Sequence, residues 1–160
     1  MSQDDFQSPR ALARFILREA LFGSLATHGE GGYPDVALVA LAALPDGSPA
    51  MLLSNLARPM KNIRKDPRAS LLFLERPQVP DLRAGARLTI TGKVVPLEKD
   101  AARTRYRIRH PEAAKDADSA DFGFWRLQIE QGHVIAPSGK ATDLDAADLL
   151  GSGSTKPAAG

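Results

Sequence analysis

The segment covering residues 52–74 constrains the fold of this chain more than any other. Two apolar runs, Met51–Leu53 and Leu71–Leu74, bracket a polar and cationic insert. Short apolar runs around such an insert predict two strands joined by a helical connection. Pro59 suits the first turn of that helix. Asp66 precedes a proline and ends it, because the residue before a proline is displaced from the α region.

The insert carries side chains that could bind a phosphate. A helix N-terminus offers free N–H groups, and neighbouring Arg and Lys side chains favour an anion there. The hydroxyl, amide and cationic donors of the insert are Ser54, Asn55, Arg58, Lys61, Asn62 and Arg64. An ordinary strand–helix–strand connection with a solvated basic face would use the same residues, so both interpretations stay open.

The rest of the chain predicts further strands and two helices. Ser8 caps a helix over residues 9–22, which Gly23 ends. A second helix is expected at Leu97–Ile108. Extended segments are expected at Ser24–Thr27, Val36–Leu44, Met51–Leu53, Ser70–Leu74, Arg87–Val95 and Phe122–Ile135, the last as a strand or a hairpin. The second of these is apolar throughout, which is typical of a strand buried on both faces.

Loops and irregularities separate these segments. Residues 76–85 contain two prolines and a glycine and are expected to form a loop. Gly92 is expected at a bulge or sharp bend, and Gln131–Gly132 at a kink or turn. Residues 151–160 have nothing apolar to bury and are expected to be a disordered tail. Six short strands favour a small closed or split antiparallel barrel, formed as one domain over residues 1–150.

Composition excludes several classes of function. The chain has no cysteine, which rules out disulfides and thiolate chemistry. The net charge is only +2, and the arginines of RTRYRIR alternate around a helix, so a nucleic-acid partner is not expected. His28, His110 and His133 lack metal-ligand spacing, and no metal site is predicted. An acidic, polar start and the absence of a long apolar run predict a cytoplasmic protein without a membrane partner.

Four blocks resemble a known family. SNLARPMKNIRKDPRASLLF, RLTITGKVVPLE, RYRIRHPEAA and DFGFWRLQIEQGHVI occur in the order and spacing of the FMN-binding split-barrel superfamily. The chain resembles in particular the proteins related to pyridoxamine 5'-phosphate oxidase and their haem-utilisation branch, from about Arg10 to Leu144. The resemblance implies a mainly β, α+β fold: a six-stranded antiparallel split barrel with Greek-key topology and flanking helices. It also implies a homodimer with FMN at the subunit interface.

The resemblance also implies cofactor-binding positions. Residues along the flavin and its phosphate would be Leu53, Ser54, Asn55, Leu56, Arg58, Lys61, Asn62 and Ser70. Arg87 would reach the flavin from the second subunit, and Trp125 and Arg126 would lie near the ring or the substrate. No residue stands out as a catalytic acid or base.

Departures from the family pattern reduce the number of ligands and substrates that are expected for this chain. Pro59 and Met60 replace the His and Thr of related proteins, which removes two polar ligands of the phosphate. Ala37 and Ala42 replace the Arg and Lys of the true oxidases, so pyridoxamine 5'-phosphate is not the expected substrate. Residues 136–140 lack the glycine-rich turn of the haem branch.

The expected function is therefore that of an FMN-dependent oxidoreductase acting on a small molecule that the sequence does not identify. One alternative is a non-catalytic protein that binds flavin or haem. Another is a cleft that has lost FMN.

Overall fold

A computed structural model describes residues 8–75, 81 and 85–151. Its strands are β1 (Phe22–His28), β2 (Pro34–Ala43), β3 (Pro49–Ser54), β4 (Arg68–Leu74), β5 (Arg87–Pro96), β6 (Phe122–Ile135) and β7 (Ala141–Asp145). Its helices are α1 (Pro9–Glu19), α2 (Arg58–Lys65), α3 (Lys99–Arg109), α4 (Ala114–Asp118) and α5 (Ala146–Leu149). Two 3₁₀ turns, η2 (Glu30–Gly32) and η4 (Pro111–Ala113), complete the described elements.

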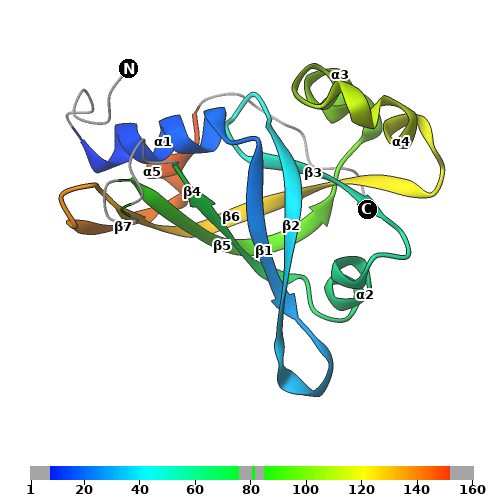
Figure 1. Cartoon of the computed structure of the whole chain (residues 1–160), viewed down its shortest axis with the longest axis horizontal. Helices are drawn as coiled ribbons and strands as arrows, with labels where there is room; N and C mark the ends of the chain where they lie inside the picture. The colour runs from blue at the N-terminus through cyan, green and yellow to red at the C-terminus, as the bar shows by residue number, and fades with distance from the viewer. Residues whose placement is uncertain (1–7, 76–80, 82–84, 152–160) are drawn as a thin grey trace.

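Six antiparallel strands close into a barrel because β3 pairs on both of its sides. The strand order is β3-β2-β1-β4-β5-β6-β7, with an additional pairing between β3 and β6 (Figure 1). Met51 of β3 faces Leu41 of β2 and Trp125 of β6. β7 extends the sheet beyond the barrel along the last residues of β6. The predicted antiparallel barrel with flanking helices is confirmed.

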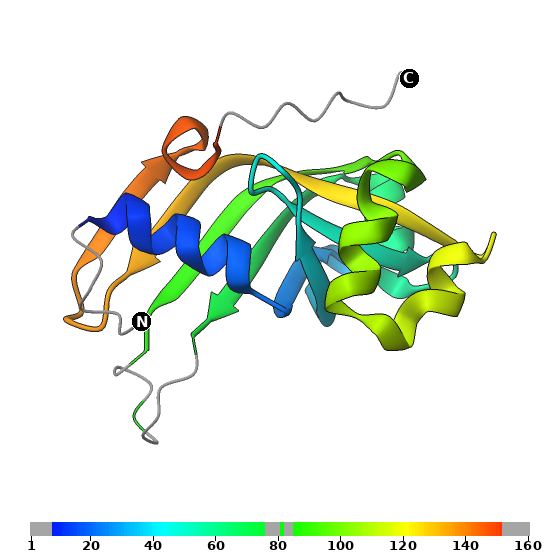
Figure 2. The ribbon, with the colours of Figure 1, turned by 90° about the horizontal axis from the view of Figure 1, so that it is seen from above.

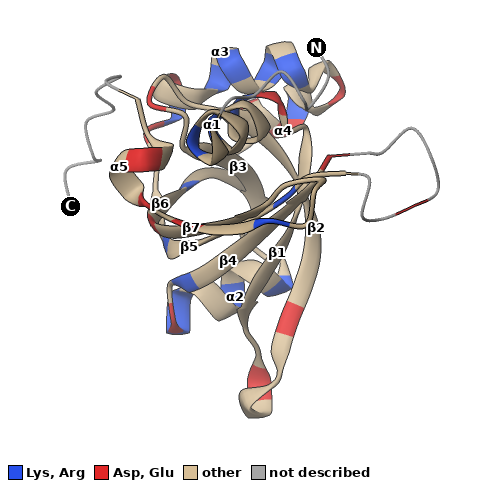
Figure 3. Ribbon diagram, turned by 90° about the vertical axis from the view of Figure 1, so that its left-hand side faces the viewer, with Lys and Arg blue, Asp and Glu red and all other residues tan. Residues whose placement is uncertain are grey.

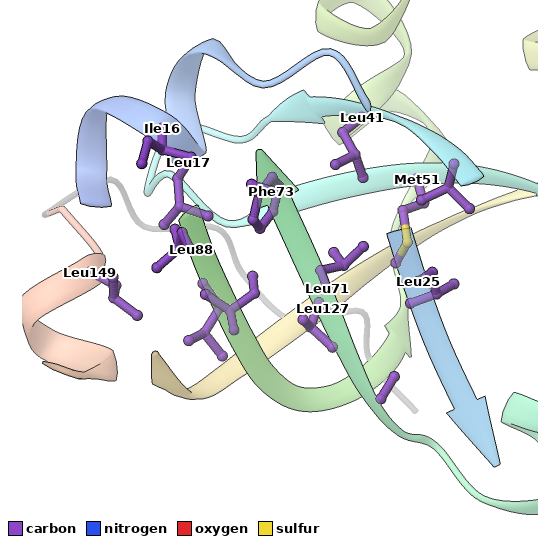
Figure 4. Close-up of a cluster of buried hydrophobic side chains, with 14 of the residues drawn as sticks. Ile16, Leu17, Leu25, Leu41, Met51, Leu71, Phe73, Leu88, Leu127 and Leu149 are labelled. Atoms are coloured by element: carbon purple, nitrogen blue, oxygen red, sulfur yellow. The ribbon is translucent and has the colours of Figure 1, made fainter. Parts of the chain in front are cut away.

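The interior of the barrel is filled by aliphatic side chains and Phe73 (Figure 4). α1 covers one end with Leu12, Ile16 and Leu17, and Leu149 of α5 packs beside it. Figure 2 shows α1 and α5 together at this end and α3 and α4 at the other. A second, smaller cluster packs Tyr106 and neighbouring residues of α3 against β2 and β6.

The first helix is shorter than predicted. It ends at Glu19, with Ala20 as its C-cap, and not at residue 22. Gly23 therefore does not end the helix but lies inside β1. A Cβ at this position would lie 3.0 Å from Cδ1 of Leu41 and 3.3 Å from the carbonyl oxygen of Leu72. The glycine is explained by the close approach of neighbouring strands.

The bulge predicted at Gly92 is confirmed. Thr91 pairs with Gln131 but Gly92 pairs with Ile129, so β6 carries one extra residue, Glu130. A Cβ on Gly92 would lie 1.9 Å from the carbonyl oxygen of Gln128, which excludes any side chain. β6 runs without a break over 14 residues, so the turn considered at Gln131–Gly132 is not formed.

Several sequence-based expectations need completion or correction. β7, α5 and the short α4 were not predicted; α5 begins with a capping box formed by Asp145 and Asp148. Residues 152–160 of the expected tail and most of the expected loop at 76–85 lie outside the described residues. No helix among the described residues is long and apolar enough to cross a membrane.

β2 is not buried on both faces in the single chain. Val39 and Leu41 point into the core, but Val36 is 64% exposed and Leu38 is 75% exposed on the opposite side. Ser24 pairs with both Leu38 and Leu72, which places the two leucines on either side of β1. Large exposed apolar side chains thus continue across three neighbouring strands. We call this surface the outer face; its large apolar residues are Phe22, Val36, Leu38, Leu72 and Leu74.

Candidate functional site

α2 presents a buried apolar side and an exposed cationic side. Its buried residues are Pro59, Met60, Asn62 and Ile63. The helix has no side-chain N-cap, because Ala57 stands at that position, and Asp66 is its C-cap. Its four cationic side chains, Arg58, Lys61, Arg64 and Lys65, all border the same groove. The amphipathic pattern explains this division, since the polar residues fall on the side that the core does not cover.

This groove, which we call the α2 groove, separates α2 from the turn between β1 and β2. It has a volume of about 710 Å³ and is lined by Gly29, Glu30, Tyr33, Pro34, Asp35, Arg58, Lys61, Asn62, Arg64 and Lys65. Figure 3 shows the basic residues of α2 and the acidic residues of the β1–β2 turn at the same end of the barrel. Four of the donors named from the sequence, Arg58, Lys61, Asn62 and Arg64, therefore line one groove.

A chain of hydrogen bonds fixes the floor of the α2 groove. Nδ2 of Asn62 donates to Oγ1 of Thr27 at 3.0 Å and to Oδ2 of Asp35 at 3.1 Å. The other oxygen of Asp35, Oδ1, accepts from Nη1 of Arg58 at 3.4 Å. Thr27 and Asn62 are buried, so their hydrogen bond is inside the protein. Asn62 thus holds α2 against the first two strands.

The connection from β3 to α2 is held by its own polar groups. The backbone N–H of Asn55 donates to the carbonyl oxygen of Asp121 at 2.9 Å, and its side-chain amide donates to Ala120 at 3.2 Å. Arg64 donates to the carbonyl oxygen of Asn55 at 3.0 Å. Oγ of Ser54 accepts from the N–H of Leu56, whose side chain is 83% exposed. Ser54 and Asn55 therefore shape the loop that leads into α2.

A second groove, which we call the strand groove, lies on the outside of the barrel next to the bulge. Its volume is about 420 Å³, and it is lined by Ala26, Thr27, His28, Gly32, Pro34, Arg68, Ala69, Ser70, Thr91, Gly92 and Glu130. The predicted residue Ser70 lies here and not in the α2 groove. Ala26 pairs with Ser70, and Ser70 pairs with Thr91, so the floor consists of small side chains.

An ion pair at the end of α2 borders the strand groove. The guanidinium of Arg68 donates to both carboxylate oxygens of Asp66, the shortest contact being 2.6 Å. These hydrogen bonds hold the pKa of Asp66 far below its usual range and raise the pKa of Arg68. Nε2 of His28 lies 3.9 Å from Oδ2 of Asp66.

The other predicted residues lie away from both grooves. Leu53 is in the core, and Trp125 is partly buried against the same core. Nε1 of Trp125 is buried and has no hydrogen-bond partner among the described residues. Arg87 begins β5, and Nε of Arg87 is buried without a hydrogen bond in the part of the chain that the structure describes. Arg126 is buried with its Nη1 3.9 Å from Oδ2 of Asp46, at the end of β3 opposite to α2.

Sequence reasoning missed the residues that other elements bring to the two grooves. Tyr33 and Asp35 follow the β1–β2 turn, and His28 precedes it. The strand register, with Thr27 opposite Asp35, places them beside α2. Alternation in the sequence puts His28 on the same side of β1 as Ala26, and this is the signal that could have found it. No group of three or more potential metal ligands was found among the described residues.

The fold and the grooves define a class of protein: a split barrel with a cationic helix after its third strand and a cofactor-sized groove beside it. Residues 9–136 match the family model described as Pyridoxamine 5'-phosphate oxidase. The chain belongs to this family.

Individual relatives have haem-related names. Non-canonical heme oxygenase HOZ, chloroplastic, from Arabidopsis thaliana, is 37% identical over 151 residues, which are 91% of this chain and 44% of that protein. The structure of a heme binding protein from Mycobacterium smegmatis is 27% identical, with a TM-score of 0.83, and the match covers 90% of this chain and 60% of that one. HutZ, a heme storage protein from Vibrio cholerae, is 25% identical, with a TM-score of 0.64 and coverage of 77% and 90%. The chain spans less than half of the Arabidopsis protein.

Proposed function

We propose that this chain is a haem-binding protein that works as a homodimer, with haem held where the outer face meets the strand groove and the α2 groove. Pro34 lines both grooves, and Val36 of the outer face lies two residues further along β2. The observation that carries the proposal is thus the meeting of three surfaces at the β1–β2 hairpin. These are exposed apolar side chains, a strip of small side chains with one histidine, and a cluster of cations.

The chemistry of haem requires such a combination. The porphyrin is flat and apolar, and the small side chains of Ala26, Ser70 and Thr91 leave a shallow surface for it. The propionates are anions, which Arg58 and Lys61 could bind through charge-assisted hydrogen bonds. The iron takes an imidazole ligand, and His28 is the histidine that lines a groove. When bound, haem would supply a redox-active iron.

FMN fits these residues less well. A phosphate monoester carries a charge between about −1.5 and −2 at neutral pH and needs several donors. Pro59 offers no backbone donor, Met60 is buried in the core, and Asn62 uses its amide N–H groups inside the protein. Asp35 adds a carboxylate at the place where the phosphate was expected. The donor set is incomplete for a flavin phosphate.

The outer face supports a homodimer. A contiguous patch of large apolar side chains is unusual on a monomer and is typical of an interface. Leu38 and Val36 are mostly exposed, although they belong to a strand with the apolar content of a buried one. A second copy with the same patch would cover it by two-fold symmetry. Light scattering of the purified protein would then give twice the mass of the chain, and Leu38→Asp would give the monomer.

Haem binding is tested by titrating the protein with hemin. We expect a Soret band that saturates at a fixed ratio of haem to chain. His28→Ala should shift this band and weaken binding, since the iron would lose its imidazole. His133→Ala is the matched control. His133 belongs to the same β-sheet but lines neither groove, and its Nδ1 is 2.7 Å from a carboxylate oxygen of Asp143. Equal spectra for all three proteins would reject His28 as the ligand, and no saturation would reject haem binding.

A flavin-dependent oxidoreductase is the second candidate, and the family membership favours it. The fluorescence of FMN should then be quenched on addition of the protein, with reduction of the bound flavin by NADPH or NADH. Turnover of haem is a separate question, tested by adding a reductant to the haem complex and following loss of the Soret band. A yellow protein as purified, with no response to hemin, would replace the first proposal by the second.

A further inference from the structure

Asp35 occupies an unexpected place in the α2 groove. Its carboxylate contacts two of the three groove residues that sequence resemblance predicts as phosphate ligands, Asn62 at 3.1 Å and Arg58 at 3.4 Å. We propose that Asp35 determines the ligand preference of the groove by excluding phosphate monoesters. The proposal rests on the proposed function only for the position of the ligand site beside α2.

The geometry makes Asp35 an internal substitute for an anion. The side chain is 19% exposed, so the carboxylate is at the floor of the groove and not at its rim. Asn62 directs its amide toward Asp35 from the buried side, and Arg58 approaches it from the solvent side. A phosphate bound to the same two groups would have to replace this carboxylate or lie against it.

Electrostatics then separates the possible ligands. Repulsion from a fixed carboxylate grows with the charge of the incoming group and is strong at short distance in a partly buried site. A phosphate monoester brings a charge between about −1.5 and −2, whereas each carboxylate of a propionate brings −1 and sits on a flexible arm. Asp35 should therefore penalise FMN more than haem.

A purely structural role does not explain the charge at this position. Arg58 has a side chain that is 78% exposed, and its contact with Asp35 is long, so the pair adds little to stability. The hydrogen bond from Asn62 needs only an acceptor, which an amide oxygen provides equally well. Asp35→Asn thus keeps the shape and the acceptor for Asn62 and removes the charge; the oxygen that faces Arg58 becomes an NH2 group, at the cost of one weak, exposed contact.

The test compares flavin binding by Asp35→Asn and by the unmodified chain. We expect Asp35→Asn to bind FMN about tenfold more tightly, measured by quenching of flavin fluorescence. Riboflavin, which has the same ring without the phosphate, should bind both proteins equally. Glu30→Gln is the matched control: Glu30 lines the same groove, but its carboxylate is 91% exposed and lies 3.8 Å from Lys65. It should change the affinity for FMN less than twofold.

The outcome of this test does not depend on whether the protein binds haem. A gain in FMN affinity would support the role of Asp35 even if hemin did not bind, because the readout contains no haem. If Asp35→Asn unfolded, Asp35→Ser would remove the same charge with a smaller side chain. Unchanged FMN affinity in the folded variant would overturn the proposal. An equal gain for riboflavin, or an equal effect of Glu30→Gln, would overturn it too.

Discussion

Two cationic regions of this molecule use their positive charges differently. At the junction of α1 and α5, Arg14 donates to three backbone carbonyls: Nε to Asp148 at 2.7 Å, and Nη2 to Ala147 at 3.1 Å and Leu150 at 3.0 Å. In the α2 groove the contacts of Arg58 and Lys65 with carboxylates are 3.4 and 3.8 Å long and lie in solvent. The first region completes the end of a helix, whereas the second leaves its cationic side chains largely exposed to solvent.

The same comparison separates two arginines that sequence resemblance had grouped together. Arg58 and Arg126 were both expected to bind the cofactor. Arg126 is buried beside Asp46, whose Oδ1 also accepts from the N–H and hydroxyl of Ser48. Arg58 is exposed at the groove. We therefore expect Arg126 to contribute to stability and Arg58 to contribute to binding.

The largest effect is expected for Arg126→Met. The substitution removes the guanidinium that lies 3.9 Å from the mostly buried carboxylate of Asp46, and breaking a buried ion pair typically costs about 3 kcal/mol of unfolding free energy. Haem affinity should stay within twofold. Urea denaturation and hemin titration measure the two quantities. If affinity fell while stability held, Arg126 would belong with the ligand-binding residues.

Arg14→Ala should cost somewhat less, about 2 kcal/mol of unfolding free energy. It removes the hydrogen bonds that satisfy the last carbonyls of α5, and hydrogen bonds to a charged donor contribute about 1.5 to 3 kcal/mol. Arg14→Lys should recover only part of this loss, since one ammonium cannot reproduce the spacing of the guanidinium donors. Stabilities of Arg14→Ala and the unmodified chain that agree within error would show that α5 stays in place without the Arg14 hydrogen bonds.

Replacing both Arg58 and Lys61 by Ala should have the opposite effect: it should weaken hemin binding and leave stability almost unchanged. Stability should change by less than about 0.5 kcal/mol, because both side chains are exposed. Hemin affinity should fall about tenfold, and more steeply at low salt, where screening is weak. Arg103→Ala on α3 is the control for a general loss of positive charge. Equal effects of the double variant and the control would remove the α2 groove from the binding site.

The sequence was sufficient to predict the barrel and the helix α2. Alternating apolar residues and the cationic insert predict strands β3 to β5 and the helix between them, and Gly92 predicts the bulge. The strand β7 and the helix α5 escaped prediction because residues 141–149 are short and polar, with burial limited to Leu149 and a few partly covered residues. β7 is held by its pairing with β6, and α5 by packing against β6 and α1. Local sequence does not encode these contacts.

The site was predictable only where it lies on one contiguous segment. Arg58, Lys61 and Asn62 were found because they share a helix. Asp35 and His28 were missed because their place beside α2 depends on strand pairing over long sequence distances. The exposed side of β2 was also misjudged: an apolar pattern shows that a surface is to be covered, but not whether the same chain covers it.

The smallest effect concerns the loss of folding stability at low pH that Asp148, at the α1–α5 junction, produces. The pKa of Asp148 lies below its usual value of 3.8, mainly because its carboxylate accepts from the backbone N–H of Asp145 and also from the guanidinium of Arg10. A depressed folded-state pKa adds stability that is present above about pH 3.8 and is lost as the pH falls through the folded value. Asp148→Asn should therefore flatten the decrease of the urea midpoint between about pH 5 and pH 3.

Glu19→Gln, an exposed carboxylate change at the end of α1, is the control for this measurement. It should leave the slope of the acid limb as it is in the unmodified chain, because no hydrogen bond ties the Glu19 side chain to the described residues. The ion pair of Asp66 with Arg68 remains in both variants and has a depressed carboxylate pKa of its own, so some decrease below pH 4 should persist. An unchanged slope in Asp148→Asn would mean that α5 stays docked when its capping carboxylate is protonated. The carbonyl bonds of Arg14 would then be sufficient to hold the junction.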